Sequence, residues 1–125
     1  MNAHSLASAA YGHANTAQKT PRAAEYDVIA RITSRLRTAV ETSPRNFAML
    51  AEAMHENSRL WTEFAIDLAG TGNGLPQTLR VQLLQIAQFT LRHTDKVLSG
   101  QEDPAVLVDI NLAILRGLSG KGDAA

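Results

Sequence analysis

The residue types that most often carry catalysis or bind metals are sparse in this chain of 125 residues, which has no cysteine. The histidines are His4, His13, His55 and His93. None of them pairs with another at the three- or four-residue spacing that puts two metal ligands on one helix face. His55-Glu56 resembles the start of a helical zinc motif, but Arg59 occupies the position four residues after His55. The sequence therefore predicts no metal site, no catalytic centre, no cofactor and no small-molecule substrate.

A glycine-rich run from Gly70 to Gly74 could be taken for a phosphate-binding loop, because backbone N–H groups before a helix attract anions. A phosphate-binding loop of the P-loop type follows a strand and ends in a Lys-Ser or Lys-Thr pair. This run follows a predicted helix instead, and it lacks that pair. It is better explained as a turn between two helices.

Arginines concentrate in the first half of the chain, and Arg31, Arg35 and Arg37 could contact RNA phosphates from one predicted helix. Glu25 and Asp27 are interleaved with them, and no aromatic platform accompanies them. Twelve basic residues against twelve acidic ones also leave no net charge to attract nucleic acid or a membrane surface. A solvated helix with local ion pairs is favoured, and RNA binding is kept as the alternative.

Two asparagines fall on predicted apolar helix faces, with Asn57 between Met54 and Trp61 and Asn111 between Leu107 and Ile114. A buried amide must find hydrogen-bond partners. Either the two amides form a network in the core, which is favoured, or they line a groove that accepts the backbone of a partner. Trp61 is expected in the core, and an interface anchor is its alternative role.

Helix start signals divide the chain. Thr20-Pro21, Ser43-Pro44 and Asp103-Pro104 each place a capping oxygen before a proline that suits the first helical turn, and Pro76 follows the glycine-rich turn. Apolar residues recur with a helical period between these points, and no useful length of sequence alternates with period two. The fold predicted is all-α, a compact bundle of four main helices at about 21–41, 44–69, 76–98 and 104–118.

The remaining organisation follows from composition. Residues 1–20 are predicted to be a mobile or partly helical N-terminal arm, 21–118 a single helical domain and 119–125 a flexible tail. No secretion signal and no membrane-spanning apolar stretch is recognisable, so we expect a cytoplasmic protein. In the helix at 76–98, apolar residues wrap more than half of the circumference, so this helix must contact several neighbours or leave apolar surface for a partner.

Several blocks, in one order along nearly the whole chain, resemble the FlaF family of flagellar regulators. They are Pro21-Arg22 with Glu25, then Glu56-Asn57-Ser58-Arg59-Leu60-Trp61-Thr62 leading to Asp67, then Asn73-Gly74-Leu75-Pro76 with Leu79-Arg80, then Asp109-Ile110-Asn111 leading to Gly117-Leu118. Tyr11 matches an early tyrosine of that family.

The resemblance implies a non-enzymatic regulator of flagellin synthesis that works with the partner protein FlbT and is needed for flagellin export. It also implies direct contact with flagellin, as in a secretion chaperone. A scaffold that acts only through FlbT is a further alternative. The candidate residues for contact with a partner are Asn57, Trp61, Leu75, Phe89 and Asn111; for the two asparagines and the tryptophan this is the alternative to a place in the core.

Overall fold

The computed structural model describes residues 21–43, 45–70, 72 and 74–118. The predicted arm at 1–20 and the predicted tail at 119–125 lie outside these residues. Within the described part of the chain, no helix is long and apolar enough to cross a membrane.

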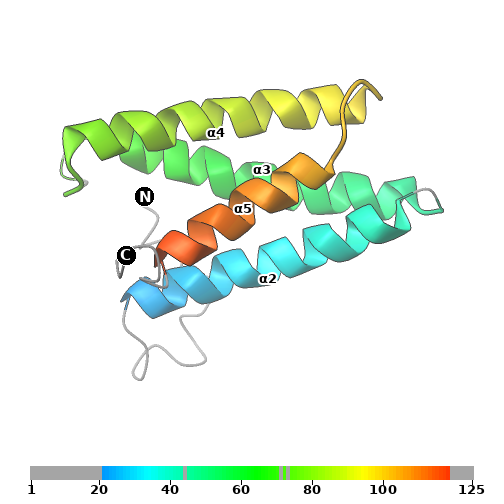
Figure 1. Cartoon of the computed structure of the whole chain (residues 1–125), viewed down its shortest axis with the longest axis horizontal. Helices are drawn as coiled ribbons and strands as arrows, with labels where there is room; N and C mark the ends of the chain where they lie inside the picture. The colour runs from blue at the N-terminus through cyan, green and yellow to red at the C-terminus, as the bar shows by residue number, and fades with distance from the viewer. Residues whose placement is uncertain (1–20, 44, 71, 73, 119–125) are drawn as a thin grey trace.

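Four helices make up the described fold, as the sequence predicted. They are α2 (Pro21–Thr42), α3 (Phe47–Ala69), α4 (Gln77–Leu98) and α5 (Ala105–Leu118). Successive helices run in opposite directions, and α5 crosses the face of the bundle obliquely (Figure 1). The closest pairs are α3 with α4, α2 with α3, and α2 with α5. The chain is therefore an all-α four-helix bundle in which α5 leans towards α2.

The start of α3 differs from the prediction. The helix begins at Phe47, and the side chain of Asn46 caps it by accepting a hydrogen bond of 3.0 Å from the backbone N–H of Met49. A capping amide satisfies one of the N–H groups that a helix leaves unpaired at its start, so Asn46 replaces the expected Ser43 in this role. Asp103 does cap α5 as predicted, because its Oδ1 accepts from the N–H of Ala105 at 2.9 Å.

A glycine ends α4. Gly100 has a φ of 80°, which a side chain disfavours, and it allows the chain to close the helix with two reversed hydrogen bonds. The N–H of Gln101 donates to the carbonyl of Lys96 at 2.8 Å, and that of Gly100 donates to Val97 at 2.9 Å. This turn directs the chain back along the bundle into α5.

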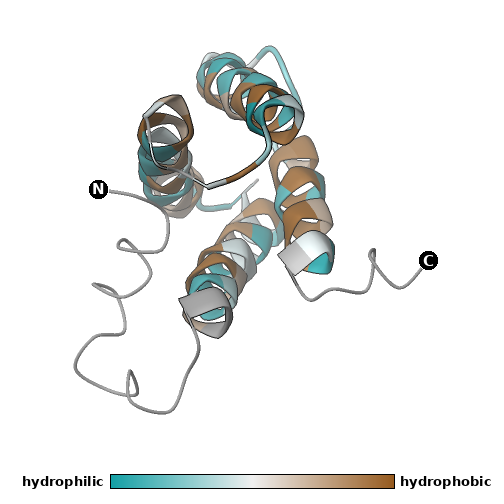
Figure 2. Ribbon diagram, turned by 90° about the vertical axis from the view of Figure 1, so that its left-hand side faces the viewer, coloured by the Kyte–Doolittle hydropathy of each residue, from teal (hydrophilic) through white to brown (hydrophobic). Residues whose placement is uncertain are grey.

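The buried apolar residues form two clusters, one towards each end of the bundle. The first draws on all four helices and contains Leu36, Ala39, Leu50, Ala53, Met54, Val97, Leu107 and Val108. The second contains Ala24, Val28, Ile29, Ile32, Leu60 and Leu115, which come from α2, α3 and α5. Figure 2 looks along the bundle from the end where α2 begins and shows the four helices around a common centre. At this end α4 adds no buried residue to the core cluster.

Candidate functional site

Both asparagines singled out in the sequence are fully buried, and their amides contact each other. Asn111 donates from Nδ2 to Asn57 Oδ1 at 2.8 Å and to Thr33 Oγ1 at 3.1 Å. The Oδ1 of Asn111 accepts from the indole Nε1–H of Trp61 at 3.0 Å. Asn111 thus ties α5 to both α2 and α3 through side chains alone.

Thr33 extends this network to the backbone, since its hydroxyl donates to the carbonyl of Ile29 at 2.7 Å. Among the described residues, three buried polar atoms have no hydrogen-bond partner: Asn57 Nδ2 on α3, and Arg80 Nε and Thr90 Oγ1 on α4. A buried polar group without a partner costs free energy in the folded state. We therefore expect Thr33 and Thr90, two buried threonines, to respond in opposite ways to the same substitution.

Thr33→Val should lower the free energy of unfolding by roughly 1–2 kcal/mol, because one amide hydrogen of Asn111 loses its acceptor. Thr90→Val removes a hydroxyl that has no partner, so the free energy of unfolding should stay the same or rise by up to about 1 kcal/mol. Urea denaturation followed by circular dichroism measures both variants on one scale. Equal losses in the two variants would contradict the network.

A row of apolar residues on α4 is partly exposed. We call Leu79, Leu83, Ile86 and Phe89 the apolar strip; their spacing of four, three and three residues places them on one side of the helix. Leu79 is 40% exposed and Phe89 50%, and the other two are half-buried. Leu75, in the loop just before the helix, is 40% exposed. Exposed apolar residues that adjoin one another mark a surface able to bind a partner.

The apolar strip continues the core-facing side of α4. Further along the same side, Thr90, His93 and Val97 are all buried. This side of α4 is buried in the second half of the helix and partly exposed in the first half, because α5 packs chiefly against α2 and contacts α4 much less. Figure 1 shows α5 ending beside the start of α2, away from the first turns of α4. The first half of α4 therefore has α3 as its main neighbour.

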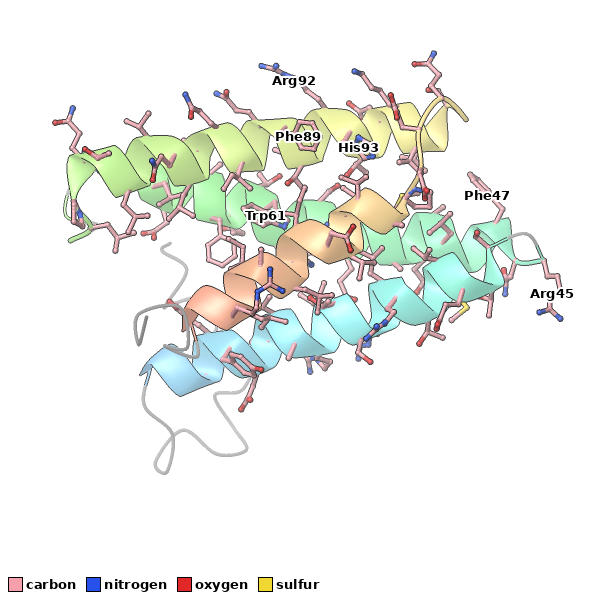
Figure 3. All side chains as sticks on the ribbon, in the orientation of Figure 1. Arg45, Phe47, Trp61, Phe89, Arg92 and His93 are labelled. Atoms are coloured by element: carbon pink, nitrogen blue, oxygen red, sulfur yellow. The ribbon has the colours of Figure 1, made fainter. Side chains whose placement is uncertain are left out.

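Phe89 is the last residue of the apolar strip and lies next to the buried part of α4. Its ring stacks on the imidazole of His93 with ring centroids 5.4 Å apart (Figure 3). His93 Nε2 lies 2.8 Å from the carbonyl oxygen of Asp103, which can only accept, so this nitrogen bears a hydrogen and donates the hydrogen bond. The loop between α4 and α5 thereby fixes the imidazole that supports Phe89.

The predicted arginine surface lies in a different place, at a groove of about 910 Å³ between α2 and α3. Arg31, Arg35 and Arg59 line this groove together with Glu52, Glu56 and Glu63. Arg35 forms an exposed ion pair of 2.7 Å with Glu56. Three carboxylates among three guanidinium groups leave no excess positive charge for phosphates.

Arg37 is exposed outside this groove, since a two-residue step turns a helix by more than half a circle. His55 also lines the groove. Among the residues that the structure describes, no three His, Asp or Glu side chains are grouped so that they could hold a metal ion.

A family model for flagellar protein FlaF matches residues 7–118, almost the whole chain. The chain belongs to the FlaF family. No curated protein and no solved structure matches it. The family is one of flagellar proteins and not of enzymes.

Two of the blocks that resemble FlaF sequences supply the buried network. Asn57 and Trp61 come from the block at 56–62, and Asn111 from the block at 109–111. In this FlaF chain, these three residues of the expected partner-binding set lie inside the core, whereas Leu75 and Phe89 lie at the surface. Thr33 was missed by sequence reasoning, although it lies one turn after Ile29 on the buried face of α2.

Proposed function

We propose that this FlaF protein regulates flagellin synthesis and export without catalysis, by binding an amphipathic helix of flagellin on the apolar strip of α4. The observation that carries the proposal is the exposed continuation of the core-facing side of α4 past the point where α5 turns away. Helices that dock in this manner insert residues at spacings of three and four into an apolar surface. Flagellin bound in this way would be kept from polymerising before export.

The proposal leaves room for FlbT as a second partner. FlbT would act on the flagellin complex from outside the strip, and the groove between α2 and α3 presents both charge signs for a polar contact of that kind. Of the two surfaces, the strip has the more exposed large apolar side chains, Leu79 and Phe89 at its two ends.

Leu79→Glu and Phe89→Glu should each reduce flagellin recovered in co-purification by at least tenfold, because a carboxylate would have to be desolvated against the partner helix. Both residues are at least 40% exposed, so helicity measured by circular dichroism should be retained. Phe47→Glu is the matched control: Phe47 is 56% exposed and lies on α3, remote from the strip (Figure 3).

Full flagellin recovery with both strip variants would refute docking at the strip. Recovery of flagellin only when FlbT is also present, with both lost together, would support the scaffold alternative. Salt-sensitive binding of flagellin message, lost when Arg31, Arg35 and Arg37 are neutralised, would support the RNA alternative.

A further inference from the structure

The first half of α4 is unusual for its lack of charge. Between Gln77 and Leu91 the only Lys, Arg, Asp or Glu is Arg80, and the polar positions are mostly glutamines. Exposed helix faces normally carry charged residues opposite their apolar side. The α2 and α3 surfaces follow this rule, with three arginines and three glutamates at their groove. A neutral, apolar surface is best matched by a segment that is itself neutral.

One segment of this chain has that character. Residues 1–20 contain Lys19 as their only Lys, Arg, Asp or Glu. Small and apolar residues recur in them at helical spacing, namely Ala3, Leu6, Ala7, Ala10, Ala14 and Ala17. Small side chains let a helix approach its neighbour closely, which suits a surface on which Leu79 and Phe89 already project.

The segment is attached where it can reach the strip. It joins the bundle at Pro21, the first residue of α2, and α2 and α4 begin at the same end of the bundle (Figure 1). At about 1.5 Å per residue, a helix built from most of the segment would be as long as the uncovered part of α4. The family match also starts at residue 7, so it includes most of this segment with the bundle.

We infer that residues 3–17 pack as a helix on the apolar strip of the same chain when no partner is bound. The segment then completes the second core cluster from the α4 side, where the described residues supply no buried α4 side chain. A partner helix must displace it, so the segment acts as an internal competitor for the strip. The inference shares its surface with the proposed function but does not require flagellin to be the partner.

Paramagnetic relaxation in the full-length protein tests the inference directly. The chain has no cysteine, so Ser8→Cys provides a single attachment site for a nitroxide label. Amide signals of Leu79, Leu83 and Ile86 should lose most of their intensity, whereas that of Glu52, in the groove between α2 and α3, should not. Adding Leu6→Glu to the labelled protein should restore the intensities.

Unchanged amide intensities along α4 in the labelled protein would overturn the inference. A mixture of labelled protein with isotope-enriched unlabelled protein identifies exchange between chains. Loss of α4 intensity in the enriched copies would show that the segment covers the strip of a second molecule, which would also overturn it. Flagellin is absent from all these samples, so failure here leaves the proposed function untouched.

Discussion

Asn111→Leu should lower the free energy of unfolding by roughly 2–5 kcal/mol, even though leucine is close in size and more apolar. The substitution leaves the indole N–H of Trp61 without its acceptor and Asn57 Oδ1 without its donor. Each orphaned group costs about 1–3 kcal/mol when it cannot reach water. Removal of one partner from a buried polar pair therefore lowers the free energy of unfolding more than removal of both partners does.

Urea denaturation followed by circular dichroism gives this loss, and Asp109→Asn is the control on the same helix. Asp109 is exposed, so its substitution should change stability by less than about 0.5 kcal/mol. Combining Asn111→Leu with Asn57→Leu should cost less than the sum of the two single changes, because the second removes a group that the first has orphaned. Strict additivity would show that the two amides are independent.

The helices follow from local sequence, which is why they could be predicted. Proline start signals and the 3.6-residue period place α2, α4 and α5 to within about two residues. The start of α3 was displaced to Phe47 because Asn46 competes with Ser43 as a cap, and the choice depends on how the preceding turn closes. Such competition between neighbouring capping residues is decided by the loop and not by either residue alone.

Surface properties that depend on packing could not be predicted in the same way. Periodicity indicated that α4 is apolar over most of its circumference, but which half of the helix is covered depends on where α5 crosses. In the sequence of α2 the arginines form a basic cluster, yet the fold places Glu52, Glu56 and Glu63 of α3 beside them. The net charge of a groove depends on both helices that line it, so it cannot be predicted from the sequence of one helix.

The two asparagines show both what local sequence predicts and what only packing decides. Their positions on apolar faces were visible in the sequence, whereas their pairing across 54 residues of chain was not. Thr33 joins them from a third helix, 78 residues from Asn111. Polar groups of this kind restrict the bundle to an alignment of α2, α3 and α5 that satisfies them, which we expect to fix helix register at a modest cost in stability.

Trp61→Ala should lower the free energy of unfolding by roughly 3–5 kcal/mol, the usual cost of a large aromatic residue in a core. Trp61 is 2% exposed, its indole N–H holds Asn111 Oδ1 at 3.0 Å, and its ring lies 5.5 Å from that of Phe64. The substitution opens a cavity and also leaves the Asn111 carbonyl without a donor. Since small domains are stable by only about 5–15 kcal/mol, the loss should be evident as a large fall in the urea midpoint.

Phe47→Ala is the control, because it removes an aromatic ring from the same helix at a site that is 56% exposed (Figure 3). Its effect should be within about 0.5 kcal/mol. Trp61→Phe separates the two contributions: it keeps most of the ring and removes the N–H donor, so it should cost about 1–3 kcal/mol. A Trp61→Ala protein with unchanged stability that no longer binds flagellin would show that Trp61 reaches the partner, and that the bundle opens around α5 when the partner binds.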